Sequence, residues 1–103
     1  MVQIVWTEPA LNDLDAIADS IALDNPGAAR LLVRRVFKHV SQLAAHPDSG
    51  SKPRELRGWR YRQIIEPPCR IFYWRAGDTV YIPHVMRSER KLRRRRLATR
   101  DKT

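Results

Sequence analysis

The sequence predicts an α+β domain with the element order β-α-α-β-β-β, in which an antiparallel sheet carries a helical hairpin on one face. Three observations support this prediction: a short apolar run near the N-terminus, two stretches with helical periodicity, and three strand-like segments that follow a loop. A chain of 103 residues commonly forms one domain, and it can bury enough apolar surface to fold without disulfides or metal ions.

The N-terminal half is expected to form one strand and then the two helices. The run VQIVW at 2–6 is rich in β-branched and aromatic residues, which favours a strand. Thr7 can cap a helix that extends to about Ala22, and a second helix begins at Pro26 after a turn. On the first helix, the solvent side is expected to carry Asp13, Asp15 and Asp19. The predicted core residues of the hairpin are Leu14, Ile21, Val36, Phe37 and Val40.

The C-terminal half is expected to supply the rest of the sheet. After a loop rich in proline, glycine and serine, strand candidates lie at 59–65, 69–75 and 79–85. The connection AGD at 76–78 predicts a hairpin, so the last two strands are expected to be antiparallel neighbours. Pro83 cannot donate a hydrogen bond within a sheet. Its strand is therefore expected to lie at an edge, to contain a bulge, or to end early.

Alternation along the strands groups the residues of the sheet by face. The three expected groups are Arg60, Arg62 and Ile64; Arg70, Phe72 and Trp74; and Val80, Ile82, His84 and Met86. Arginines, a histidine and aromatic rings on an open face can bind a phosphodiester and stack a base. The alternative is that Phe72, Trp74 and Ile82 are core residues beneath the helices. Periodicity leaves both interpretations open, because it does not tell which face the helices cover.

Positive charge is concentrated at the C-terminal end. Nine lysines and arginines lie from residue 87 onward, against two acidic residues, so this segment holds seven of the nine net positive charges. Such a segment favours nucleic acid or a machine that handles nucleic acid, because phosphate-bound counterions are released when cations bind. Charge for solubility and attraction to acidic proteins are the alternatives.

Metal binding and cysteine chemistry have little support in the sequence. His39, His46 and Cys69 lack the close spacing of metal ligands, and no base is identified that could activate the thiol. With one cysteine, no run of about 18 apolar residues and no signal-peptide pattern, the chain is expected to be soluble and cytoplasmic, without a metal or cofactor.

Six segments resemble toxins of the RelE/ParE superfamily from bacterial type II toxin–antitoxin systems. In chain order they are WTEPALNDLDAIADSIALDNP, HPDSG, RELRG, YRQII, CRIFYWRAGDTVYI and HVMRSER, and they span about residues 4–92. We therefore expect one toxin domain at 1–92 and a basic C-terminal tail at 93–103. The resemblance implies a compact sheet with a helical hairpin, and an antitoxin partner that wraps around the toxin and neutralises it.

The resemblance also implies one of two activities. Members of the RelE branch cut mRNA on the ribosome without metal, and members of the ParE branch poison DNA gyrase. Two catalytic lysines of the RelE branch fall here on Arg62 and Ile64. Its catalytic arginines fall on Arg70 and on either Arg87 or Ser88, and its tyrosine falls on Arg94.

The departures from the RelE pattern favour the ParE branch. An arginine is a poor proton acceptor, and an isoleucine cannot take part in the chemistry. His84 is the one residue in the predicted sheet whose side-chain type exchanges protons near neutral pH, and it is expected to share a groove with Arg70. The alternative function is a ribosome-dependent, metal-independent endoribonuclease that uses Arg62, Arg70, His84 and Arg87. A nucleic-acid-binding module without toxicity is the third interpretation.

The residues expected to contact the target are the same whether the target is gyrase, the ribosome or nucleic acid. The sheet and its end would supply Arg60, Arg62, Arg70, His84, Arg87 and Arg90, and the tail would supply Lys91, Arg93, Arg94, Arg95 and Arg96. The tail is expected to form either one or more helical turns or a mobile arm. Its deletion is expected to leave the fold intact, since residues 93–103 offer only Leu97 for burial.

Overall fold

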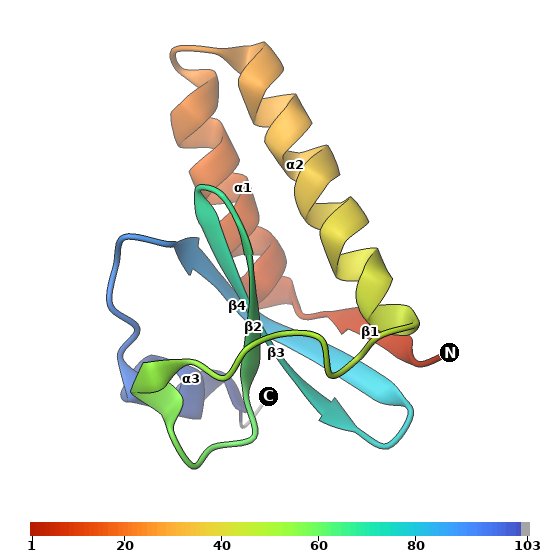
Figure 1. Cartoon of the computed structure of the whole chain (residues 1–103). Coiled ribbons are helices and arrows are strands. Elements are labelled where there is room, and N and C mark those ends of the chain that lie inside the picture. The colour runs from red at the N-terminus through yellow and green to blue at the C-terminus, as the bar shows by residue number, and fades with distance from the viewer. Residues whose placement is uncertain (102–103) are drawn as a thin grey trace.

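The computed structural model describes residues 1–101, which form four strands, three α-helices and two short 3-10 segments (Figure 1). The strands are β1 (Gln3–Trp6), β2 (Arg62–Glu66), β3 (Cys69–Ala76) and β4 (Thr79–Arg87). The helices are α1 (Glu8–Ala22), α2 (Pro26–Ser41) and α3 (Arg94–Asp101), and the 3-10 segments are η1 (Gln42–Ala44) and η2 (Arg54–Leu56). No helix among these residues is long and apolar enough to cross a membrane.

Both helices of the hairpin begin where the sequence predicts. The side chain of Thr7 accepts a hydrogen bond from the Ala10 amide at 3.3 Å, and that of Asn25 accepts one from the Ala28 amide at 3.0 Å. Each helix has a proline in its first turn, where a missing amide hydrogen removes no intrahelical bond. These caps start two helices close together in the chain, and α1 and α2 consequently pack side by side (Figure 1).

The α+β class and the order β-α-α-β-β-β are confirmed, but the sheet is mixed rather than wholly antiparallel. Its strand order is β1-β4-β3-β2, with β3 antiparallel to both of its neighbours. β1 lies parallel to β4 at one edge. No tight turn joins these two strands, so the chain connection does not impose an antiparallel pairing.

The hairpin covers one face of the sheet. Ile64, Ile71, Tyr73, Val80, Ile82 and Val85 point from the sheet into this main core. The hairpin contributes Ala10, Leu14, Leu32, Val36 and Val40. The predicted burial of Leu14, Val36 and Val40 is confirmed, whereas Ile21 is half-buried.

Phe37 was also expected in this core, and that prediction is wrong. Its side chain is 40% exposed and packs at the flank of the hairpin against Trp6, with ring centroids 4.8 Å apart. The buried stripe of α2 passes through Leu32, Val36 and Val40, and Phe37 lies one position beside it. Large apolar residues at the flank of a helix are commonly only half covered.

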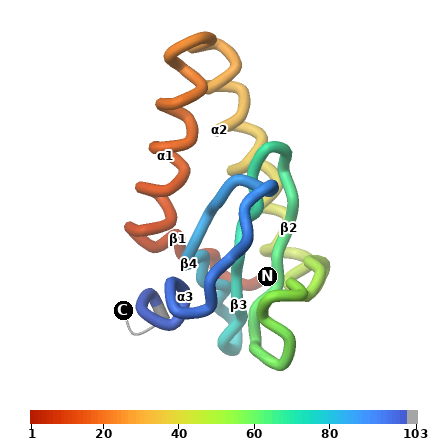
Figure 2. The backbone as a smooth tube through the Cα atoms, turned by 90° about the vertical axis from the view of Figure 1, so that its left-hand side faces the viewer, coloured from red at the N-terminus to blue at the C-terminus, as the bar shows by residue number. Residues whose placement is uncertain are grey.

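A second, smaller core covers the opposite face of the sheet. It contains Leu56, Tyr61, Phe72, Leu92 and Leu97. The C-terminal segment that was expected as a tail therefore includes a docked helix, which lies beside β4 in Figure 2. Leu97 is completely buried. The expectation that deletion of residues 93–103 leaves the fold intact therefore underestimates the packing of this side chain.

A β-bulge in β4 explains which residues reach each face. Phe72 pairs with His84, but Trp74 pairs with Tyr81, so β4 has one extra residue at Ile82 and Pro83. Of the three options for Pro83, the bulge is confirmed. The extra residue reverses the alternation, and His84 therefore faces Phe72 while Ile82 lies in the main core. The prediction that Ile82 and His84 share a side is wrong for this reason.

The loop segment HPDSG is held against the sheet through a close approach at Gly50. The Gly50 amide donates a hydrogen bond to the Tyr73 hydroxyl at 2.9 Å. A Cβ atom at this position would lie 2.6 Å from both the Tyr73 hydroxyl and the Gln63 carbonyl oxygen. Only glycine therefore fits here.

Candidate functional site: a basic groove beside the C-terminal helix

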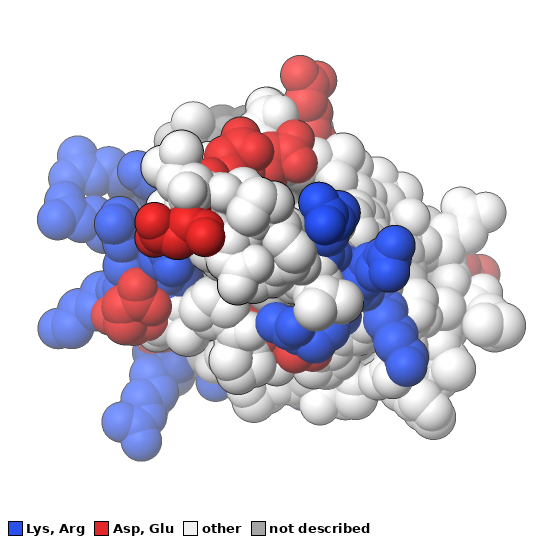
Figure 3. Space-filling model, turned by 90° about the horizontal axis from the view of Figure 1, so that it is seen from above, with Lys and Arg blue, Asp and Glu red and all other residues white. Residues whose placement is uncertain are grey.

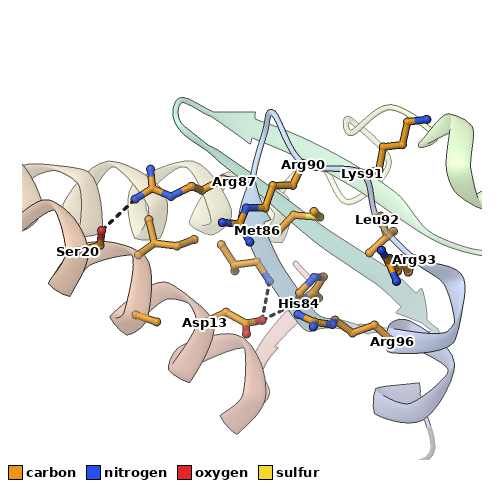
Figure 4. A pocket seen from close by; sticks show the side chains of 13 residues that line it. Asp13, Ser20, His84, Met86, Arg87, Arg90, Lys91, Leu92, Arg93 and Arg96 are labelled. Carbon is orange, nitrogen blue, oxygen red and sulfur yellow. Dashed lines mark hydrogen bonds and ion pairs between the residues drawn. The ribbon is translucent and has the colours of Figure 1, made fainter.

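A groove of about 640 Å³ lies between α1, the end of β4 and the segment that leads into α3 (Figure 4). We call it the basic groove, because five of its lining residues are cations: Arg87, Arg90, Lys91, Arg93 and Arg96. Its α1 wall is formed by Asp13, Ala16, Ile17 and Ser20, and its remaining lining by His84, Val85, Met86 and Leu92. Among these residues Asp13 is the only acid.

Asp13 connects three elements at one end of the groove. Its carboxylate lies 2.7 Å from Nδ1 of His84 on β4 and accepts the Val85 amide hydrogen at 3.1 Å. Arg100 on α3 donates to both carboxylate oxygens, at 3.0 Å to Oδ1, and also to the Pro83 carbonyl at 3.2 Å. The ion pair therefore fastens α3 to α1 and β4.

Asp13 is ionised at neutral pH. Burial alone would raise the pKa of its carboxyl group, but the hydrogen bonds from His84, Arg100 and the Val85 amide outweigh burial and lower the pKa to about 2. The negative charge is consequently neutralised inside the protein by Arg100 and adds little to the field of the groove.

His84 is held in place and closed to solvent. Its side chain is on the floor of the groove but only 2% of the residue is exposed, and its ring stacks on Phe72 with centroids 5.8 Å apart. Nδ1 lies 2.7 Å from the Asp13 carboxylate and 2.6 Å from Nη1 of Arg100. This nitrogen can donate to the carboxylate or accept from the guanidinium, but it cannot do both at once.

Arg70 is also buried, in a second ion pair. Its guanidinium donates to both carboxylate oxygens of Glu55, at 2.8 and 2.9 Å, and to the side-chain oxygen of Gln63 at 2.8 and 3.0 Å. A further bond of 3.2 Å reaches the Arg90 carbonyl. Glu55 accepts the Leu92 amide hydrogen at 3.3 Å as well, so this ion pair fastens the segment that precedes α3.

The Glu55 carboxylate is stabilised chiefly by Arg70. The hydrogen bonds from this guanidinium lower the pKa of Glu55 to about 2, against the opposing effect of burial, and the Leu92 amide adds to the lowering. The Arg70 guanidinium is bound on two sides and lies 4.8 Å from the Phe72 ring centroid. It therefore offers no open face to a ligand.

The expectation that Arg70 and His84 share a groove is wrong. Arg70 does not line the basic groove, although its guanidinium and the His84 ring each lie against Phe72. The bulge brings His84 opposite Phe72, whereas Arg70 pairs with Met86 further along the sheet.

The other predicted residues of the sheet are dispersed. Arg62 pairs with Tyr73 and Ile64 with Ile71, so both lie on the hairpin side of the sheet, opposite to Arg70. Arg62 donates to the Gly50 carbonyl at 2.8 Å. On the α3 side, the Arg60 guanidinium lies 3.6 Å from the centroid of the Trp74 ring.

The predicted residues of the C-terminal segment are brought together. Arg87 donates to the Ser20 hydroxyl at 3.4 Å and lines the groove with Arg90, Lys91, Arg93 and Arg96. Arg94 points instead to the Glu55 carbonyl, with a bond of 2.8 Å from Nε, and Arg95 is exposed on α3.

The sequence did not reveal the residues that fasten α3. The helical pattern predicts Asp13 on the solvent side of its helix, and Glu55, Gln63 and Arg100 belong to no recognisable motif. A signal existed for Asp13, because it is adjacent to the buried Leu14 and so borders the apolar stripe of α1. No comparable signal existed for Glu55, which lies in a 3-10 segment without a repeating pattern. Among the described residues no group of three or more histidines, cysteines, aspartates or glutamates could hold a metal ion.

Comparison with known proteins identifies the family. The family model described as the ParE toxin of type II toxin–antitoxin system, parDE, matches residues 4–92. The chain belongs to the ParE toxin family. The match covers the helical hairpin, β2 to β4 and all of β1 except Gln3, and it ends at Leu92, before α3.

One curated relative and one solved structure are also similar to the chain over most of its length. The chain is 34% identical over 94 residues to Toxin RelE2 of Caulobacter vibrioides, an alignment that covers 87% of this chain and 99% of the relative. A solved structure described as the chromosomal ParDE TA system from P. aeruginosa is similar with a TM-score of 0.71 and 28% identity, over 86% of this chain and 98% of that one.

Proposed function

We propose that this ParE-family toxin inhibits growth by acting on DNA gyrase, and that an antitoxin encoded beside it neutralises it by binding. The family membership supports the toxin function and the antitoxin partner. The choice of gyrase over mRNA cleavage rests on the geometry of the residues that RNA chemistry would need.

The observation that carries the proposal is the burial of Arg70 and His84 in internal contacts. Metal-free RNA cleavage requires a base at the 2′-hydroxyl and donors that stabilise the charge developing on the phosphate. Arg70 is 7% exposed and bound to Glu55 and Gln63, and His84 is 2% exposed and bound to Asp13. Neither can reach a substrate without breaking an internal ion pair.

The remaining positions of the RelE pattern support the same conclusion. Ile64 is part of the main core and has no group that could exchange a proton. Arg62 lies on the hairpin side of the sheet, away from the basic groove, and only Arg87 remains at the groove. One arginine can bind phosphate but cannot supply both the acid and the base.

The target can be tested with two parallel assays of the purified full-length chain. In the first, gyrase and relaxed plasmid are mixed with the chain, and we expect loss of supercoiling or accumulation of cleaved DNA. In the second, a translating extract is supplied with an mRNA, and we expect no new cuts within codons.

The alternative function is a RelE-like nuclease, and the relative named Toxin RelE2 is the specific reason to test for it. Ribosome-dependent cuts that disappear in Arg70→Ala or His84→Gln would overturn the gyrase proposal. Because both residues are buried, each variant must first show a cooperative thermal transition by circular dichroism. Lys52→Ala, an exposed residue outside the groove, is the matched control for handling and expression.

The antitoxin partner is supported by apolar side chains that the hairpin leaves uncovered. Leu31 is 54% exposed, and Leu11, Leu23 and Phe37 are exposed as well. A partner segment with apolar anchors could cover such side chains and fold as it binds. Expression of the chain alone is expected to slow bacterial growth, and co-expression of the adjacent gene to restore it. Normal growth in the presence of folded protein would contradict the toxin function itself.

A further inference from the structure

We infer that the basic groove and the exposed side of α3 form a binding site for the phosphate backbone of duplex DNA, which the chain can occupy without gyrase. This goes beyond the proposed function, because inhibition of gyrase requires no direct contact between the toxin and DNA. The inference rests on the density of cations at this site, on the internal pairing of Asp13 and Glu55 beside them, and on the fixed positions of the cations.

The cations are dense and accessible. Residues 87–96 contain seven lysines and arginines and one acid, Glu89. Five of the seven line the basic groove, and Arg94 and Arg95 continue the positive surface onto α3. Figure 3 shows Lys and Arg side chains gathered at the left edge of the molecule. A surface of this kind attracts polyanions and releases their counterions.

Two of the acids beside these cations are already compensated. Asp13 is paired with Arg100 and Glu55 with Arg70, and the pKa of each carboxyl group is lowered to about 2 by its partners. Arg70 is buried and Arg100 is partly buried, and neither of them lines the groove. The five lining cations are therefore not neutralised by these two carboxylates.

The cations are held by a folded backbone. Leu92 and Leu97 are buried on either side of Arg93–Arg96, and the Leu92 amide is bound to Glu55. Helix α3 is fastened at its other end through Arg100. Binding a ligand here therefore costs less conformational entropy than binding by a mobile arm would.

The chemistry favours phosphate groups in a long row. Six of the seven cations are arginines, whose planar guanidinium groups bind phosphate oxygens through two parallel hydrogen bonds. Arg94 and Arg95 are exposed outside the groove and add to its positive charge. Duplex DNA carries a charge every ~1.7 Å along its axis, so it can contact the groove and the exposed side of α3 at the same time.

The site can be tested by fluorescence anisotropy of a labelled duplex of about 20 base pairs, titrated with the full-length chain at several salt concentrations without gyrase. The test variant is Arg90→Gln/Lys91→Gln/Arg93→Gln, whose three residues line the groove. The matched control is Arg30→Gln/Arg34→Gln/Lys38→Gln on α2, which removes the same charge from exposed residues outside the groove.

We expect the groove variant to bind DNA at least roughly tenfold more weakly at low salt, with a salt slope flatter by about 3, close to one unit per lost phosphate contact. The α2 control should keep the slope of the parent chain. Equal losses in both variants would mean that net charge alone drives binding, and would overturn the site. Unchanged binding by the groove variant would overturn it as well.

Two competitors distinguish the class of ligand. If polyglutamate at the same charge concentration displaces the duplex as well as unlabelled DNA does, the groove is a site for acidic polypeptides and the assignment to DNA is wrong. If an RNA duplex displaces it better than unlabelled DNA does, the site prefers RNA and the assignment to DNA is overturned. Because gyrase is absent from these titrations, their failure is distinguishable from failure of the supercoiling assay.

Discussion

At the scale of single residues, two carboxylates determine how the C-terminal part of the chain is attached. Asp13 binds Arg100 and His84, and Glu55 binds Arg70 and the Leu92 amide. Each carboxylate receives several donors in a partly buried position, where an unpaired partner would be costly. These contacts explain why the most basic residues of the chain are ordered, although like charges repel one another.

The Asp13 ion pair can be tested by Asp13→Asn. The substitution removes the charge that compensates Arg100 and is expected to lower the free energy of unfolding by about 2–4 kcal/mol, the range for breaking a partly buried pair. The control is Asp15→Asn, an exposed residue of the same helix, for which we expect less than about 0.5 kcal/mol. Urea denaturation followed by circular dichroism measures both. Equal effects of the two substitutions would show that the ion pair is not stabilising.

The same carboxylates predict the acid sensitivity of the fold. The pKa values of Asp13 and Glu55 are lowered to about 2 in the folded chain, from ordinary values of 3.8 and 4.5. The unfolded chain therefore binds more protons between about pH 4.5 and 2, so stability is lost as the pH falls through this window. In Asp13→Asn the decline of the melting temperature over this range should be shallower than in the parent chain. An identical decline would exclude Asp13 as a source of the acid sensitivity.

At the scale of elements, α3 behaves as part of the core rather than as an appendage. Leu97 is completely buried in the second core with Leu56, Tyr61 and Phe72. Helix α3 is short and strongly polar. Its helical structure therefore depends on the packing of Leu97 and on the ion pair of Arg100 with Asp13 rather than on its own sequence.

Leu97→Ala tests the packing of α3. Removal of a fully buried leucine side chain is expected to cost about 2–4 kcal/mol, because it leaves a cavity in a small core. Leu31→Ala is the control, and it should cost less than about 1 kcal/mol since that side chain is 54% exposed. Chemical denaturation gives both values, and a similar small loss for the two variants would indicate that α3 is not docked in solution.

Phe37→Ala should likewise cost less than a core phenylalanine would, since the ring is partly exposed.

At the scale of the whole molecule, the sheet is covered on both faces and acts as the shared layer of two cores. The hairpin lies on one face, and α3 with η2 lies on the other. The radius of gyration is 13.2 Å, close to the ~13 Å typical of one compact domain of this length. Loss of either cover should therefore affect the whole sheet.

Deletion of residues 93–103 tests this dependence. The deletion removes Leu97 and Arg100 and uncovers the aromatic face of the sheet around Phe72. We expect a lower melting temperature and increased binding of a hydrophobic dye. DNA affinity should fall as well, since the deletion also removes Arg93 to Arg96. If the truncated chain melts at the same temperature as the parent chain, residues 93–103 do not stabilise the fold.

The class of fold, the helical hairpin, the last two strands and the family resemblance can all be predicted from the sequence. These features depend on local signals: Thr7 and Asn25 can cap helices in any context, and the periodicity of α1 and α2 indicates their buried stripes, although Phe37 lies at the flank of its stripe. The concentration of positive charge after Arg87 is equally local, because it can be counted.

The roles of the sheet residues depend instead on contacts that form only in the folded chain. The bulge at Ile82 and Pro83 changed the face of His84, and strand register separated Arg62 from Arg70. The pairing of Arg70 with Glu55, and of Arg100 with Asp13, joins residues far apart in the chain. A one-residue shift reverses every later side chain of a strand, and ion pairs between distant elements follow no sequence period. These contacts bury two residues that the sequence suggested for catalysis and leave the cations of the basic groove exposed.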